Sequence, residues 1–170
     1  MSCRLRTKIN SLVSDWEASG LPGRTTLHEI ADDLLAWRSD HNVAGLWQTP
    51  PCMMGATLDD AWGLGIELIL KYAGVLGMET RYLGVLLTWQ ELVAACRSFR
   101  PDYLGLTLLQ LDSEDDVIAL RKQLPAEVKI IAGGPVFKLD ADLQERAGID
   151  VVAKDLTVFL RFLLEPALSC

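Results

Sequence analysis

Histidine is scarce in this sequence, and its cysteines are few and scattered. Only two histidines are present, His28 and His41, and no pair of cysteines has the CxxC spacing. A zinc site needs several such ligands at short spacings, so no zinc centre is expected. The cysteines are expected to be reduced thiols, as in a cytoplasmic protein. They are Cys3, Cys52, Cys96 and Cys170.

Positive charge is in deficit. The chain has 16 Lys and Arg against 23 Asp and Glu, a net charge of −7 and a pI of about 4.8. This balance disfavours nucleic acid, which is bound by clustered Lys and Arg, and it disfavours anionic membrane surfaces. Charges interrupt every apolar stretch well before the roughly 20 residues that a membrane-spanning helix needs. Residues 1–6 contain no apolar signal segment. We therefore expect a cytoplasmic protein that binds neither nucleic acid nor a membrane.

The first 50 residues predict a short helical segment with a linker. Apolar residues recur at helical spacing over residues 4–18 and again over residues 26–40, and a Ser-Gly-Leu-Pro-Gly run separates the two patterns. Two helices cannot bury both of their faces alone, so they should dock on the rest of the chain or pair in a homodimer. We expect a domain boundary after this segment, with residues 51–170 forming the main domain.

After Pro51, short apolar runs alternate with longer helical patterns. Half of the chain is hydrophobic, which is enough for a substantial core. Five β-α units in succession predict a parallel sheet with helices on both faces, in the flavodoxin-like (Rossmann-like) order 2-1-3-4-5. Such a fold binds its ligand at the carboxyl ends of the strands. Strands are expected at 52–57, 80–85, 103–108, 128–132 and 151–153, with helices at 62–76, 89–99, 113–124, 139–147 and 156–164.

The loops of this predicted sheet disfavour two common uses of the fold. An FMN phosphate is bound by backbone N–H groups after the first strand, and here that loop carries the negative charges of Asp59 and Asp60. A phosphoacceptor receiver domain needs a carboxylate at the end of the third strand, but the first carboxylate after Thr107 is Asp112. Neither flavin nor phosphoryl chemistry is therefore expected.

Three loop motifs indicate a different ligand. They are Asp60-Ala61-Trp62-Gly63-Leu64-Gly65 after the first strand, Thr107-Leu108-Leu109 after the third, and Ala132-Gly133-Gly134-Pro135 after the fourth. In these motifs the chain resembles the cobalamin-binding domain family of methyltransferase corrinoid proteins, which has DxHxxG, SxL or TxL, and GG at the same places. The spacing from Gly65 through Gly77 to Val85 fits the family without a gap. The resemblance covers residues 52–164.

The resemblance implies a cobalamin (corrinoid) cofactor whose nucleotide tail runs between the sheet and its first helix. Thr107 would hydrogen-bond along that tail, or else bond its own backbone. Glycines would let the backbone approach the tail at positions 65, 133 and 134. The alternatives are that Gly65 is an ordinary helix residue and that Gly133 and Gly134 only form a tight turn. The cofactor-binding residues implied in this way are Leu58, Asp60, Trp62, Gly65, Gly105, Thr107, Leu109, Gly133, Gly134, Pro135 and Ala153.

Trp62 departs from the family, because it stands where the family has the histidine that binds cobalt. An indole has an N–H donor but no lone pair, so Trp62 cannot coordinate a metal, and no metal ligand is assigned. Three outcomes stay open. The corrinoid could bind with its base displaced and Trp62 beneath the ring, which would ease reduction of the cobalt. The indole could fill the cleft and abolish binding. Finally, His28 or His41 could supply a ligand.

The function implied by the resemblance is that of a carrier. The chain would carry methyl groups, or be reduced, in partnership with separate methyltransferase proteins, because it shows no nucleophile triad or zinc site of its own. The N-terminal segment would be a truncated form of the family's helical cap. The alternative is a non-catalytic sensor or interaction module on the same fold that has lost or altered corrinoid binding.

Overall fold

The computed structural model describes residues 2–165 and contains a five-stranded sheet. Its strand order is β2-β1-β3-β4-β5, and all neighbouring strands run parallel. The predicted flavodoxin-like topology is therefore confirmed. The strands are β1 (Cys52–Thr57), β2 (Glu79–Gly84), β3 (Tyr103–Thr107), β4 (Lys129–Gly133) and β5 (Val151–Val152).

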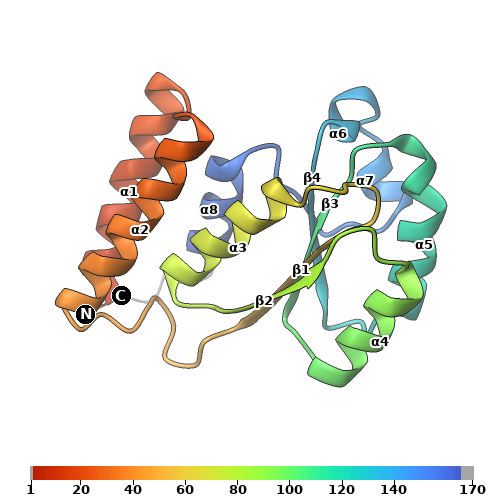
Figure 1. Ribbon diagram of the computed structural model, residues 1–170, viewed down its shortest axis with the longest axis horizontal. Coiled ribbons are helices and arrows are strands. Elements are labelled where there is room, and N and C mark those ends of the chain that lie inside the picture. Colours follow the sequence, from red (N-terminus) through yellow and green to blue (C-terminus); the bar gives the residue numbers. More distant parts are fainter. Residues whose placement is uncertain (1, 166–170) are drawn as a thin grey trace.

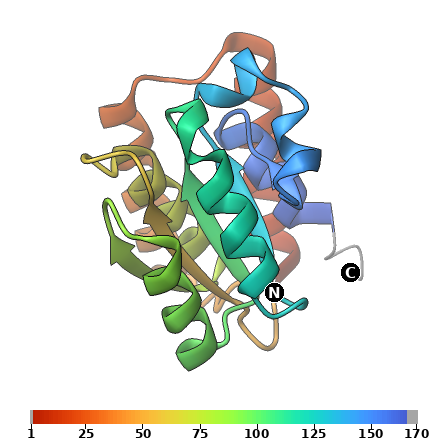
Figure 2. The same ribbon diagram turned by 90° about the vertical axis from the view of Figure 1, so that its right-hand side faces the viewer.

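Helices cover both faces of the sheet (Figure 1). One face carries α3 (Leu64–Leu76) and α8 (Leu156–Leu164). Figure 2 looks onto the other face, which carries α4 (Trp89–Phe99) and α5 (Glu114–Gln123). Successive residues of a strand point to opposite faces, so the core divides into two hydrophobic clusters. Met53 of β1 belongs to the cluster under α3, and Met54 belongs to the cluster under α4.

The segment after β4 differs from its prediction. The pattern over residues 139–147 predicts one helix, but the structure has two one-turn helices, α6 (Val136–Leu139) and α7 (Leu143–Arg146). Asp140 separates them because its backbone is extended, with φ −140° and ψ 98°. Arg146 forms ion pairs with both Asp140 and Glu114, which hold this irregular segment against α5. The prediction of one continuous helix was therefore wrong.

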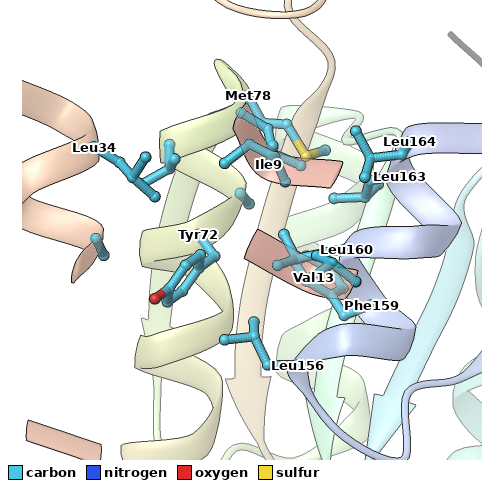
Figure 3. Packing of buried hydrophobic residues seen from close by; sticks show 14 of the residues in the cluster. Ile9, Val13, Leu34, Tyr72, Met78, Leu156, Phe159, Leu160, Leu163 and Leu164 are labelled. Atoms are coloured by element: carbon cyan, nitrogen blue, oxygen red, sulfur yellow. The ribbon is translucent and has the colours of Figure 1, made fainter. Parts of the chain in front are cut away.

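Helices α1 (Ser2–Ser19) and α2 (Arg24–Asp40) form a further layer outside α8 and α3 (Figure 1). Ile9 and Val13 of α1 belong to one hydrophobic cluster with Phe159 and Leu163 of α8 (Figure 3). The two helices thus dock on the main domain, which is one of the arrangements expected from the sequence. Homodimer formation and the division of the chain after residue 50 stay predictions.

Buried polar contacts join α2 to α3. The Tyr72 hydroxyl donates a hydrogen bond to the Leu27 carbonyl oxygen at 2.8 Å, and burial raises the pKa of Tyr72. Arg38 donates hydrogen bonds to the carbonyl oxygens of Gly74 and Val75 at 2.6 and 2.9 Å. The last carbonyls of a helix lack amide partners within the helix, so Arg38 both caps α3 and anchors α2 to it.

Burial disfavours the reactive thiolate form at Cys52 and Cys96. Cys52 and Cys96 are free thiols, and burial raises the pKa of Cys96 to about 11. Cys170 lies outside the described residues. Within residues 2–165, no helix combines the length and the apolar character needed to cross a membrane.

Candidate functional site

The β1–α3 loop begins at a buried threonine that ties two loops together. The Thr57 hydroxyl accepts a hydrogen bond from the Leu86 N–H at 3.1 Å and donates one to the Asp60 carbonyl oxygen. The Thr57 carbonyl oxygen accepts a further bond from the Leu87 N–H at 2.9 Å. The β1–α3 and β2–α4 loops are therefore held side by side at the carboxyl edge of the sheet.

Asp59 joins the same loop to the β3–α5 loop. Its carboxylate accepts hydrogen bonds from the Leu109 N–H at 2.9 Å, the Gln110 N–H at 3.0 Å and the Ser113 hydroxyl at 2.8 Å. Sequence analysis missed this role and treated Asp59 only as an obstacle to phosphate. The predicted strand order could have indicated this role of Asp59. Because β1 and β3 are neighbours, a carboxylate that follows one strand lies beside the amides that follow the other.

Asp60 and Trp62 form a tight turn at the carboxyl edge. Asp60 is only 7% exposed, and its Oδ1 accepts a hydrogen bond from the backbone N–H of Trp62 at 2.8 Å. A bond from an aspartate to the backbone two residues ahead is typical of turns. Gly63 then adopts a left-handed conformation, with φ 66°, and α3 begins at Leu64, two residues later than predicted. Trp62 is 79% exposed.

A cavity of about 260 Å³ lies between the sheet, α3 and α8. The structure brings five of the residues implied by the family resemblance into its wall. They are Gly65, Thr107, Gly133, Gly134 and Ala153. The rest of the cavity wall consists mostly of apolar side chains that the sequence motifs did not indicate. Among them are Ile66, Ile69, Ile131, Leu156 and Phe159.

Thr107 and Gly65 lie beside each other in this wall. Within residues 2–165 the Thr107 hydroxyl has no hydrogen-bond partner, so it does not bond its own backbone. A Cβ added to Gly65 would lie 3.6 Å from Oγ1 of Thr107, which is an ordinary contact, and nearer to nothing else. The packing of the protein therefore does not require glycine at this position. The missing side chain leaves space next to an available hydroxyl.

The glycine pair after β4 is required by the protein itself. Gly134 has a φ of +130°, and a Cβ on it would collide with the Leu108 carbonyl oxygen. A Cβ on Gly133 would lie 2.9 Å from the Ala153 carbonyl oxygen. Both neighbours are backbone atoms that cannot give way, so larger residues are excluded with or without a ligand. These glycines form a tight turn whose backbone also lines the cavity.

The other implied residues are not part of the cavity wall. Gly105 lies within β3, where a Cβ would lie 2.7 Å from Met53 Cε and 2.9 Å from Ile66 Cδ1. A side chain at this position would have to displace the ends of two flexible side chains, Met53 of β1 and Ile66 of α3. The remaining residues belong to the loops at the carboxyl edge, and they are Leu58, Asp60, Trp62, Leu109 and Pro135.

Large apolar side chains are exposed around the carboxyl edge. Trp62, Leu139 and Leu86 are 79%, 76% and 55% exposed. They lie in or next to the segments that follow β1, β2, β3 and β4, where a sheet of this kind binds its ligand. We call this set the apolar rim, and it consists of Trp62, Leu64, Leu86, Leu109, Leu111 and Leu139.

The N-terminal helices complete the cavity on its outer side. Leu21, between α1 and α2, and Leu27 of α2 both line it. The loop motifs give no sign of this contribution, because both leucines precede β1 by 25 residues or more and reach the cavity only in the folded chain. The α1–α2 segment therefore supplies part of the cavity wall as well as part of the hydrophobic core.

The two histidines do not line the cavity. The His41 ring stacks on Trp37 with 4.8 Å between ring centroids, and its Nδ1 lies 2.8 Å from the Trp37 carbonyl oxygen. His28 lies on α2, where its carbonyl oxygen accepts a hydrogen bond from Lys71 Nζ. In the part of the chain that the structure describes, no group of three or more His, Cys, Asp or Glu side chains is placed to hold a metal ion.

Asp155 caps α8 at the margin of the cavity. Its Oδ1 accepts hydrogen bonds from the Thr157 N–H at 2.8 Å, the Thr157 hydroxyl at 2.5 Å and the Val158 N–H at 3.1 Å. Burial acts to raise the pKa of the Asp155 carboxyl, but these bonds together outweigh it and leave the pKa below its ordinary value. Asp155 is therefore ionised at neutral pH, and most of the hydrogen-bonding capacity of Oδ1 is already used.

Comparison with known proteins supports the same ligand. The family model of the B12 binding domain matches residues 52–157. No curated protein matches the sequence significantly. A cobalamin-binding protein from Desulfitobacterium hafniense DCB-2 has a similar structure, with a TM-score of 0.73 and 18% identity, over 90% of this chain and 75% of that one.

Two further similar structures come from Methanosarcina barkeri. The monomethylamine corrinoid protein has a TM-score of 0.63 and 18% identity, over 92% of this chain and 77% of that one. A chain of the methanol:cobalamin methyltransferase complex has a TM-score of 0.70 and 13% identity, over 98% of this chain and 66% of that one. Such coverage extends into the first 51 residues, because residues 52–170 are only 70% of the chain. At these identities the likeness shows the fold.

The family match includes all three loop motifs and most of the cavity wall. It begins at the first residue of β1 and ends within the first turn of α8. The resemblance drawn from the motifs is confirmed, and cobalamin is the cofactor for which the family is named. Since the family model matches more than half of its residues, this chain belongs to the B12 binding domain family.

Proposed function

We propose that this protein binds a corrinoid and carries methyl groups, or is reduced, for separate methyltransferase proteins. The observation that carries the proposal is the cavity beside Gly65 and Thr107. It is largely apolar, it contains a threonine hydroxyl that has no partner among residues 2–165, and it lies at the strand ends where the apolar rim is exposed.

The residues of the cavity fit the nucleotide tail of cobalamin. Gly65 leaves space that a Cβ would fill, and the Thr107 hydroxyl can donate or accept a hydrogen bond there. Gly133, Gly134 and Ala153 present backbone to the same space. The apolar rim would lie against the corrin ring. When bound, cobalamin supplies a cobalt centre that can accept and release a methyl group and change its oxidation state.

The position of Trp62 supports binding with the lower base displaced. Its indole is exposed and does not line the cavity, so the cavity is open with Trp62 in place. The exposure of Trp62 counts against the outcome in which its indole fills the cleft and abolishes binding. It therefore also counts against the alternative function, a sensor or interaction module that no longer binds the corrinoid. An indole has no lone pair for cobalt, and neither histidine lines the cavity. The binding mode that we propose therefore has no histidine as lower ligand.

The similar structures support the kind of partner. One is a monomethylamine corrinoid protein, and another belongs to a methanol:cobalamin methyltransferase complex. We infer the same class of partner for this chain, namely a separate protein that binds the methyl donor or the methyl acceptor and docks over the apolar rim.

The proposal is tested by mixing the purified protein with hydroxocobalamin and passing it over a desalting column. Cobalamin is expected to elute with the protein, with the absorption spectrum of cobalt from which the base has been displaced. Protein that elutes without colour would refute the proposal. A base-on spectrum would leave corrinoid binding in place and refute the displaced base.

A pair of variants tests the place of residue 62. Trp62→His introduces a nitrogen lone pair and should shift the spectrum toward nitrogen-ligated cobalt. Trp62→Phe keeps an aromatic ring without a lone pair and should leave the spectrum unchanged. An identical spectrum in both variants would mean that residue 62 does not face the metal.

A further inference from the structure

We propose that the cavity selects corrinoids whose lower base is a benzimidazole over corrinoids whose lower base is adenine. This inference rests on the proposed function, because it concerns the base that the same cavity would receive. It follows from the chemistry of the walls, which offer apolar contact on nearly every side and few hydrogen-bonding groups.

Side chains without polar atoms approach the cavity from three elements. Ile66 and Ile69 come from α3, Leu156 and Phe159 come from α8, and Ile131 comes from β4. Phe159 is fully buried, and Leu156 and Ile131 are 4% and 3% exposed. Side chains packed this closely cannot turn aside to admit water. A polar edge of a bound base that faces these side chains would therefore find no hydrogen-bond partner there.

The outer side of the cavity is lined by apolar side chains as well. Leu27 of α2 is 5% exposed, and its carbonyl oxygen is held by the Tyr72 hydroxyl at 2.8 Å. Leu21 lies beside it in the loop between α1 and α2. Leu21 is 37% exposed, so the cavity opens to solvent beside it, but both leucines offer only apolar contact to a bound base.

Among the described residues, two polar side chains reach the cavity, Thr107 and Asp155. Thr107 lies next to Gly65, at the strand end, where its hydroxyl can serve one group of the tail. Asp155 is exposed, and its Oδ1 already accepts hydrogen bonds from Thr157 and Val158. Polar contact with side chains is thus limited to Thr107 and Asp155, and the other polar groups of the wall belong to the backbone around Gly133 and Gly134.

The two kinds of lower base differ along the edges that the walls would contact. Dimethylbenzimidazole carries methyl groups there, whereas adenine carries an amino group and ring nitrogens. Even with the amino group at Asp155, the ring nitrogens of adenine would face isoleucine and leucine side chains. Because buried polar groups without partners weaken binding, we expect the adenine form to bind about 10- to 100-fold more weakly.

Equilibrium dialysis of the full chain against three corrinoids tests this selectivity. They are cobalamin, its adenine analogue pseudocobalamin, and cobinamide, which has no nucleotide tail. Cobalamin should bind most tightly, and cobinamide should bind more weakly because it leaves the cavity empty. Equal affinities for cobalamin and pseudocobalamin would overturn the selectivity and leave the proposed function intact. Cobinamide that binds as tightly as cobalamin would also overturn it. If none of the three binds, the proposed function fails and the selectivity falls with it.

A matched pair of variants at Ile69 tests the walls directly. Ile69 is half-buried in α3, and valine and threonine have nearly the same shape, so comparing Ile69→Thr with Ile69→Val isolates one hydroxyl. The threonine variant should reduce the preference for cobalamin over pseudocobalamin by roughly three- to tenfold relative to the valine variant. Thermal unfolding checks that both variants fold. An equal preference in the two folded variants would overturn the inference.

Discussion

Replacing Gly65 with alanine should stabilise the protein and weaken its binding of cobalamin at the same time. Gly65 lies in the first turn of α3, where the added Cβ makes only an ordinary contact with Thr107. Alanine is more favourable than glycine in a helix, so the free energy of unfolding should rise by about 0.5 kcal/mol. The midpoint of thermal unfolding should then rise by about 1–2 °C.

The expected loss of binding comes from the same methyl group. It would occupy the space beside the Thr107 hydroxyl, and overfilling a closely packed site costs about 1–3 kcal/mol. The Kd for cobalamin should therefore rise by roughly 5- to 150-fold. Circular dichroism during heating measures the stability, and absorbance titration with hydroxocobalamin measures the Kd.

Gly74→Ala is the matched control. Gly74 lies in the same helix, a Cβ added there meets no atom within 4 Å, and the residue does not line the cavity. This variant should gain stability and keep the wild-type Kd. If Gly65→Ala is stable and also keeps the wild-type Kd, the cavity is not the site of the nucleotide tail. If it is destabilised, the space beside Gly65 is filled by the protein itself.

Two other contacts at the site give further predictions. Asp59→Asn keeps the size of the side chain but replaces one acceptor oxygen by an NH2 group, so bonds from Leu109, Gln110 or Ser113 are lost. The free energy of unfolding should fall by about 1–2 kcal/mol in urea denaturation, with faster hydrogen exchange at the two amides and unchanged exchange in β4. Asp155 has a folded-state pKa below its ordinary value of 3.8, so the folded state binds fewer protons than the unfolded state. Its contribution to stability is present above that value and is lost as the pH falls through the lower folded-state pKa. Asp155→Asn should flatten this acid loss in thermal unfolding, and an unchanged acid profile would contradict the assignment.

Much of the fold could be predicted from local patterns. Apolar runs alternate with helical periodicity, and the right-handed crossover rule leaves few strand orders for such a chain. Sequence periodicity failed between residues 139 and 147, where it favoured one helix. There an extended Asp140 and its ion pair with Arg146 decide the structure, and neither leaves a periodic signal.

The candidate site could be predicted less completely. The glycine and threonine motifs lie in the cavity wall because strand ends meet at one edge of a parallel sheet. The direction of Trp62 depends on a turn that Asp60 closes, and a motif does not specify it. Asp59 reaches amides 50 and 51 positions away, and Leu27 reaches the cavity only through the docking of α2. Contacts over such separations depend on the assembled fold.

The pairing of α1 with α8 brings the two ends of the described chain together. Arg161 donates hydrogen bonds to Glu17 and Asn10 across 144 and 151 positions, and Arg6 donates one to the Leu164 carbonyl oxygen across 158 positions. During synthesis α1 therefore leaves the ribosome before α8, its partner helix, has been made. A nascent chain that stops before residue 156 has no α8, so its cavity lacks the wall that Leu156 and Phe159 supply. We expect capture of the cofactor to follow the docking of α8 against α1 and α3.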